Sequence, residues 1–327
     1  MISSSDFIRL PSTRDLTEGG IAYALRALPH LYKRMGRSAH DSLHRVVSEA
    51  AVELAFRRFL GEREIPFEVK SARPFTDPDH YDVSFAGRRC EIKSFFISRR
   101  EQLLQLKQNP QVLLSVPALV ASDQNAAEGH LNSDIYLFAF VAGLVAASEA
   151  DSQNVFQTEQ PYYFVHTMPE AWVRPRQWNP LGKLILKSEA VLSQRLELGG
   201  QAAGGEMSSL TVEIPPKRRV EIETGFFSLA YIHMQNRPNE RLGIHSPARK
   251  ETHVIEQADW SNLWIYDMDI LLAGYLRREE FNRRARFLRE GARVFPYDHT
   301  RIKHLAVDVS DLRPIAELLE RVKEWNL

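Results

Sequence analysis

The sequence predicts an α/β protein in which helices flank a mixed sheet and a second, β-rich domain is inserted into the chain. The first 148 residues alternate helical apolar spacing with short apolar strands. Residues 149–255 hold at least six short strand candidates separated by turn signals, which indicates a sandwich or barrel. Residues 256–327 return to longer apolar segments and would complete the first domain. The alternative is a linear order of first domain, β-rich domain and helical tail.

Composition narrows the function classes. Lysine plus arginine and aspartate plus glutamate each number 42, so contact with a polyanion must come from local patches. The single cysteine, Cys90, excludes an internal disulfide and a cysteine-rich zinc module, and it fits a reducing cytoplasm. The amino terminus lacks a signal-type apolar segment. The longest apolar run, residues 135–147, is shorter than the about 18 residues that a membrane span needs. We therefore expect a cytoplasmic protein without a membrane segment.

The order of elements in the first domain follows from apolar spacing and breakers. Residues 1–18 are polar and suggest an irregular arm. The expected elements are helices at about 21–34 and 42–60, a strand at 65–71, a hairpin at 82–95, a helix from about 99, and a buried strand from 133.

The hairpin carries the residues with the clearest chemistry. Alternation predicts strands at 82–85 and 89–95, joined by a turn at Ala86 and Gly87. Glu91 and Lys93 are two residues apart and project from one face, whereas Cys90 and Ile92 project from the other. Asp82 lies beside Glu91 if the turn sets this register. Two carboxylates and one ammonium then share a small volume.

Two neighbouring carboxylates predict a hard cation. Like charges so close are unfavourable unless a cation neutralises them, and oxygen ligands suit Mg²⁺. Magnesium usually keeps several waters, and one of them, held near Lys93, can attack phosphorus. The predicted reaction is phosphodiester hydrolysis.

The order Asp82, Glu91, one apolar residue and Lys93 resembles the PD-(D/E)XK nucleases, the restriction-endonuclease-like superfamily. Tyr81 replaces the proline before the aspartate, and Pro78-Asp79 is the competing reading. The resemblance implies a DNA endonuclease that uses Mg²⁺, with Mn²⁺ as a substitute, and leaves 5'-phosphate and 3'-hydroxyl ends. Asp82, Glu91 and the carbonyl of Ile92 would bind metal, and Lys93 would orient or deprotonate the water.

The resembled family adds a glutamate from the helix before the hairpin. Helical projection places Glu49 among the apolar side chains of that helix and Glu53 at their edge. A carboxylate on a buried helix face requires a partner, so we prefer Glu49 as catalytic residue and metal ligand. Glu53 is the alternate.

Local basic clusters are the candidate contacts to DNA. Arginine suits phosphate because its planar fork donates two parallel hydrogen bonds. Solvated helix faces and turns explain the same residues without a ligand. The candidates are Arg99, Arg100, Lys217, Arg218 and Arg219, together with Arg283 and Arg284 on an arginine-rich helix that we expect over residues 277–293.

Two other functions compete with DNA cleavage. One is a catalytically inactive nuclease fold that binds DNA or a protein; the other is a nuclease acting on RNA or single strands. The resemblance favours a role in restriction, phage defence or a mobile element. One active site per chain cuts one DNA strand. Cleavage of both strands would therefore require a homodimer, a partner subunit or sequential nicking.

Overall fold

The chain divides into two units, each described by itself. In the computed structural model, unit 1 comprises Met1–Gly20, Ser48–Leu144 and Ile265–Leu327, and unit 2 comprises Ile21–Val47 and Val145–Trp264. Residues 21–47, which sequence analysis placed in the first domain, thus cluster with the β-rich unit. The structure describes residues 2–31, 39–69, 83–127, 129–236, 239–295 and 299–325.

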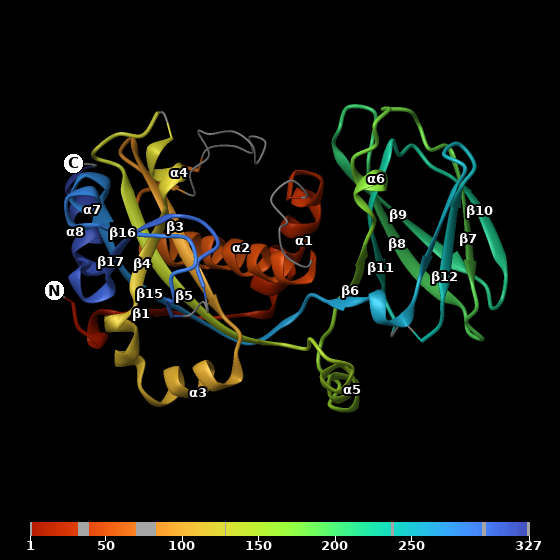
Figure 1. The fold of residues 1–327 in the computed structure, drawn as a ribbon. Coiled ribbons are helices and arrows are strands. Elements are labelled where there is room, and N and C mark those ends of the chain that lie inside the picture. Colours follow the sequence, from red (N-terminus) through yellow and green to blue (C-terminus); the bar gives the residue numbers. More distant parts are fainter. Residues whose placement is uncertain are drawn as a thin grey trace. The chain divides into compact units, whose positions relative to one another are not determined.

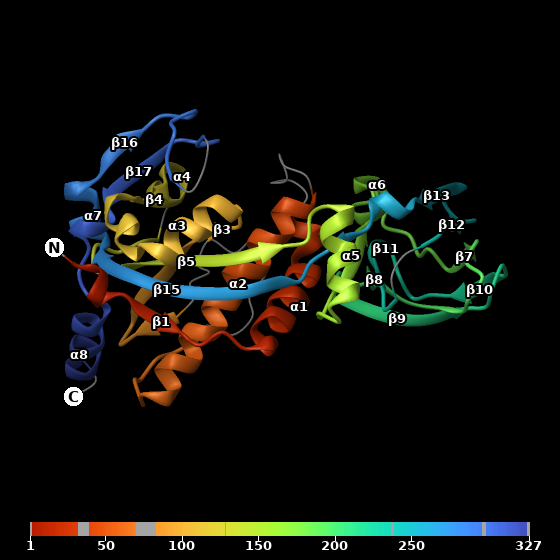
Figure 2. The same ribbon diagram turned by 90° about the horizontal axis from the view of Figure 1, so that it is seen from below.

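Unit 1 is mixed α/β and contains a curled five-stranded sheet in the order β1-β15-β5-β3-β2 (Figures 1 and 2). Strands β3 and β5 are parallel, whereas β2 with β3 and β1 with β15 are antiparallel. The strands are β1 (Ile8–Leu10), β2 (Val83–Phe85), β3 (Arg88–Ile97), β5 (Ile135–Val145) and β15 (Ile265–Arg277). Helices α3 (Arg100–Gln108) and α4 (Ser122–Ala126) belong to unit 1, whereas α1 (Arg14–Leu31) and α2 (Ala39–Glu62) each have residues assigned to both units.

The strand expected from residue 133 is confirmed as β5. Its first nine residues are all buried, which is typical of a central strand covered on both faces. The parallel pairing with β3 requires a crossover connection, and this connection includes α3. The start of β5 therefore lies beside the start of β3, where Glu91 is found.

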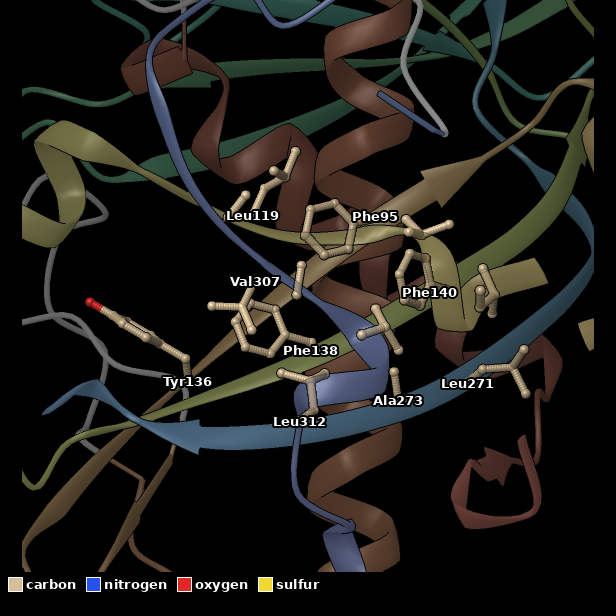
Figure 3. Close-up of a cluster of buried hydrophobic side chains, with 14 of the residues drawn as sticks. Phe95, Leu119, Tyr136, Phe138, Phe140, Leu271, Ala273, Val307 and Leu312 are labelled. Atoms are coloured by element: carbon tan, nitrogen blue, oxygen red, sulfur yellow. The ribbon is translucent and has the colours of Figure 1, made fainter. Parts of the chain in front are cut away.

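A small three-stranded sheet, in the order β16-β17-β4, packs against the five-stranded sheet. Tyr136, Phe138 and Phe140 project from one face of β5 towards this layer, where Leu119 and Val307 lie (Figure 3). The cluster is dry and apolar, so it fixes β5 against its neighbours. The remaining elements of unit 1 are β4 (Pro117–Ala121), α7 (Arg278–Arg284), β16 (Arg286–Leu288), β17 (His304–Asp308) and α8 (Ile315–Trp325).

Three expectations for unit 1 are wrong. The strand expected at 65–71 is not formed by its described residues, 65–69, of which only Glu68 makes an isolated bridge with Ser84. The amino-terminal segment is not an irregular arm, because Ile8 and Leu10 pair with Leu272 and Ile270 to form an edge strand, and α1 begins at Arg14. The arginine-rich segment after residue 277 is not one long helix. Helix α7 ends at Arg284, and the next residues pair with β17 as β16. At the amino-terminal strand and at β16, pairing with a strand distant in the sequence decides the structure, and local propensity does not report such pairing.

Unit 2 contains two antiparallel sheets, in the orders β10-β7-β12-β13 and β14-β6-β11-β8-β9, which lie face to face (Figure 1). All six strand candidates of the sequence are strands here. The first part holds α5 (Glu149–Gln157), β6 (Phe164–Thr167), α6 (Glu170–Val173), β7 (Lys183–Ser188), β8 (Gln194–Gln201) and β9 (Met207–Ile214). The second part holds β10 (Arg219–Glu223), β11 (Ser228–Met234), β12 (Leu242–Ser246), β13 (Glu251–Ile255) and β14 (Ser261–Asn262).

The glycine-rich segment at 199–205 is partly strand and partly turn. Gly199 lies in β8 directly under the Tyr231 ring, and a Cβ there would come within 2.0 Å of a ring carbon. Gly205 in the following turn has a φ of +87°, which favours glycine. Packing and turn geometry therefore explain this segment without a bound phosphate.

Two histidines of unit 2, His166 and His233, are buried. His233 contacts the Phe164 carbonyl oxygen through Nδ1 at 2.9 Å, and His166 contacts His253 with Nε2 atoms 2.9 Å apart. Burial lowers the pKa of His166 and of His233 because it penalises the charged imidazolium. Both rings serve the packing of this unit.

The longest described helix, α2, spans 24 residues and carries charged side chains along its length. Among the residues that the structure describes, no helix is both long enough and apolar enough to cross a membrane.

Candidate functional site

Strand β3 brings two of the predicted residues into direct contact. The Nζ atom of Lys93 lies 2.7 Å from Oε2 of Glu91, and their side chains are 16% and 15% exposed. Strand alternation places both on one face, as expected. The predicted partner Asp82 lies outside the described residues, immediately before Val83, which pairs with Cys90.

The start of β5 adds a carboxylate and an imidazole to this pair. Glu91 is the register partner of Tyr136, and Lys93 Nζ lies 5.6 Å from the centroid of the Tyr136 ring. The Nδ1 atom of His130 lies 3.3 Å from Glu91 Oε1 and 3.6 Å from Asp134 Oδ2. The described cluster thus holds two carboxylates, one ammonium and one imidazole.

Two atoms of this cluster are buried without a hydrogen-bond partner among the described residues. They are Oδ1 of Asp134 and Nδ1 of His130, whose side chains are 3% and 7% exposed. His130 is therefore close to both carboxylates without good hydrogen-bond geometry to either. The other oxygen of Asp134 accepts from the Leu131 amide at 2.7 Å. An unsatisfied buried polar atom costs about 1–3 kcal/mol, so this arrangement is suited to a further polar partner.

Arg278, the first residue of α7, holds the segment before β5 in place. Its amide donates to the Asp134 carbonyl at 2.7 Å, and its guanidinium donates to the carbonyl oxygens of Asn125 and His130. Asn125 in turn accepts from the Tyr136 hydroxyl at 3.0 Å. The cluster is therefore positioned by β3, β5, α4 and the start of α7.

The electrostatics of the site act on Tyr136. Burial, and then the negative charge of Glu91, raise the pKa of the Tyr136 phenol to about 12. Arg278 opposes this shift only in part. Tyr136 is consequently a neutral hydroxyl at physiological pH and contributes a hydrogen-bond donor rather than a charge.

Helix α2 packs on the opposite side of the sheet from Glu91. Phe56 of α2 meets Phe85 of β2 edge to face at 6.5 Å, and Phe85 is opposed to Arg88 in the hairpin. Opposed residues share a face, so α2 covers the side of Arg88 and Cys90. The structure therefore brings Lys93 to Glu91, but it places the helix of Glu49 and Glu53 against the other face.

The two helix carboxylates are both half-buried. Glu53 forms an ion pair with Arg57 one turn later. Burial raises the pKa of Glu53, and the charge and hydrogen bond of Arg57 oppose the shift. Glu53 thus has a local structural partner.

The predicted basic residues of unit 1 do not gather at this site. Arg99 and Arg100 are exposed and follow the carboxyl end of β3, eight and nine residues beyond Glu91. At about 3.3 Å per residue, the part of β3 from Glu91 to Ile97 alone spans about 20 Å. Arg283 and Arg284 are exposed at the carboxyl end of α7, where Arg284 binds the Asp311 carbonyl. Lys217, Arg218 and Arg219 are exposed at the β9–β10 turn of unit 2.

Sequence reasoning missed His130, Asp134 and Arg278 as members of the site. A usable signal existed for Asp134, which directly precedes the buried strand, since parallel strands bring their amino ends to one sheet edge. No local pattern marked Arg278 or His130, because their role depends on how distant segments meet.

The described carboxylates have the type of donor atom that a hard divalent cation binds. Glu91 and Asp134 supply carboxylate oxygens, and the Asp134 Oδ1 atom is buried without a partner among the described residues. Oxygen donors are what Mg²⁺ and Mn²⁺ bind. A cluster of three or more His, Cys, Asp or Glu side chains arranged to hold a metal ion is not present within the described ranges, from which Asp82 is missing.

Comparison of the chain with protein-family models, with curated proteins and with solved structures found no match.

Proposed function

We propose that this protein is a metal-dependent endonuclease of the PD-(D/E)XK type that hydrolyses phosphodiester bonds in DNA. The observation that carries the proposal is the close contact of Lys93 with Glu91 on β3, together with the nearby Asp134, whose buried Oδ1 atom has no hydrogen-bond partner among the described residues. Such a mixture of charges in one partly buried volume is typical of catalytic sites. The order of a helix, a hairpin, a helix and a parallel strand supports the restriction-endonuclease-like fold.

The proposed metal ligands are Asp82, Glu91 and the carbonyl oxygen of Ile92. Asp134 is a better candidate than Glu49 for the further carboxylate, because it lies on the His130–Glu91 side, whereas α2 covers the other face. A bound Mg²⁺ supplies Lewis-acid polarisation of the phosphoryl group and lowers the pKa of water.

The side chains of the chain supply positioning and charge. Lys93 is held by Glu91 and by Gln124, whose Oε1 accepts from Nζ at 3.2 Å. From this position the ammonium orients the attacking water and stabilises negative charge that develops on the phosphate. The ring of Tyr136 lies next to Lys93, and its neutral hydroxyl donates a hydrogen bond to Asn125. This side of the site is therefore formed by an aromatic ring that is held in place by a hydrogen bond.

The direct test is cleavage of supercoiled plasmid by the purified protein with Mg²⁺ or with a chelator. We expect nicked or linear DNA with Mg²⁺ or Mn²⁺ and none with the chelator, because the carboxylate cluster cannot act on phosphate without a cation. A single-stranded RNA of equal length serves as the competing substrate. Cleavage that persists in the chelator, or cleavage of RNA alone, would contradict the proposal.

A further inference from the structure

A large cavity in unit 2 is separate from the site on β3. Its volume is about 840 Å³, within the range of about 300–1,000 Å³ that is typical of ligand pockets. The lining comes from α6, the loop that follows it, the approach to β11 and the β12–β13 turn. All of these segments belong to unit 2, so the cavity is complete within that unit.

Charge in the cavity comes from three arginines and two glutamates. Arg174, Arg176 and Arg249 face Glu170 and Glu251, which leaves a formal charge of +1. The pairing is loose at one point, since Arg174 Nη1 lies 3.9 Å from Glu170 Oε1. Arg176 is exposed. With a formal charge of only +1, the lining suits one anionic group, such as a single phosphate.

Arg249 is held in place by three contacts within unit 2. Its Nη2 donates to the Ala171 carbonyl at 2.6 Å, and its guanidinium lies 5.2 Å from the Trp172 ring centroid. The Nε atom is 3.5 Å from Glu251 Oε2. The Nη1 atom is buried and has no hydrogen-bond partner among the described residues. The Arg249 side chain is 17% exposed, so it presents a rigidly held positive charge at the wall of the cavity.

One aromatic side chain lines the cavity, and a second one packs against it from outside the lining. Phe227 lines it, and Trp178 packs on Phe227 with ring centroids 5.6 Å apart. Trp178 donates its indole N–H to the Ala203 carbonyl at 2.8 Å and is still 42% exposed. A large aromatic side chain that is held rigidly and left exposed is suited to stacking on a planar group.

The residues on either side of Trp178 add hydrogen-bonding amides. Gln177 and Asn179 both line the cavity and are exposed. A primary amide offers a donor and an acceptor together, which matches the edge of a nucleobase. Guanidinium groups, an aromatic ring and two amide side chains thus line one cavity.

We propose that this cavity binds a single nucleotide unit of a DNA strand. In this arrangement Arg174, Arg176 and Arg249 bind the phosphate, and Phe227, supported by Trp178 behind it, stacks on the base. Gln177 and Asn179 contact the edge of the base. The inference extends the proposed function, since it assigns recognition of DNA to the β-rich unit. Its test is independent of cleavage, because binding is measured without metal.

The experiment uses the full chain carrying Lys93→Ala, in chelating buffer, and a short fluorescently labelled oligonucleotide in single-stranded and duplex form. We expect Arg176→Ala to weaken binding by about tenfold. The matched control is Arg195→Ala, an exposed arginine on β8 that does not line the cavity and should leave the affinity unchanged. Thermal unfolding of all variants checks that unit 2 is folded.

Competition separates the nucleotide from its phosphate. A free deoxynucleoside monophosphate should displace the oligonucleotide at concentrations where inorganic phosphate does not, because stacking and amide contacts require the base. Equal affinity in the Arg176→Ala and Arg195→Ala proteins would overturn the proposal. Equal displacement by phosphate and mononucleotide would overturn the assignment of a base site. If the unchanged protein does not cleave plasmid with Mg²⁺, that result would contradict only the proposed nuclease activity and not the proposed nucleotide site.

Discussion

Lys93→Ala should reduce Mg²⁺-dependent nicking of supercoiled DNA by about 10²–10⁴-fold. Lys93 is the only ammonium that the described structure places against Glu91, at 2.7 Å, and Gln124 fixes its direction. Alanine removes both the group that orients water and the charge that stabilises the phosphate. The rate is measured from the disappearance of supercoiled plasmid under single-turnover conditions.

The matched control for Lys93 is Lys323→Ala. Lys323 is an exposed lysine on α8 of the same unit, so its loss changes the net charge equally and leaves the site intact. We expect unchanged nicking by this variant. Equal activity in Lys93→Ala and the unchanged protein would indicate a contaminating nuclease or a different catalytic centre.

Phe138→Ala should lower the free energy of unfolding of unit 1 by about 3–5 kcal/mol. Phe138 is fully buried at the middle of β5 and stacks on Phe281 of α7 with centroids 5.9 Å apart (Figure 3). Truncation leaves a cavity in a close-packed cluster, and Phe138 is also the register partner of Lys93. The measurement is urea denaturation followed by circular dichroism.

Phe287→Ala is the control for the loss of aromatic area. Phe287 lies on β16 and is 54% exposed, so its truncation should change the free energy of unfolding by less than about 0.5 kcal/mol. Similar destabilisation by the two variants would show that the cluster around Phe138 does not hold unit 1 together.

The sequence predicted elements best where one pattern was strong over many residues. The buried run of β5 and the alternating strands of unit 2 have such patterns, and tertiary packing agrees with them. Prediction failed where pairing partners were distant. Strand β1, Ile8–Leu10, is only three residues long. It forms by pairing with β15, about 260 residues later in the chain.

The arginine-rich segment shows the same limit. Local charge pattern and helix formers favoured one long helix, but Arg286 pairs with Ala306 in a sheet and its guanidinium binds Asp308 at 2.7 Å. The ladder and this ion pair exist only once β17 is in place. Local propensity cannot report such contacts.

The sequence predicted the residues of the candidate site that lie on β3, but not those that neighbouring segments contribute. Alternation alone put Glu91 and Lys93 on one face, because strand geometry fixes that relation. The contributions of His130, Asp134 and Arg278 follow from the parallel register of β3 with β5 and from α7 meeting the start of β5. The same register argument, applied to the hairpin, explains why α2 and Glu49 belong to the other face.

Binding of Mn²⁺ to Glu91→Gln, followed by the electron paramagnetic resonance of the free ion, tests the central claim most directly. Glutamine keeps the size of the side chain and an acceptor for Lys93, but it removes the carboxylate charge that a metal ligand requires. Glu320→Gln, an exposed change on α8, is the control. We expect the unchanged protein and the control to bind Mn²⁺ equally and Glu91→Gln to bind at least about tenfold more weakly. Equal Mn²⁺ affinity in all three proteins would contradict a metal centre at Glu91.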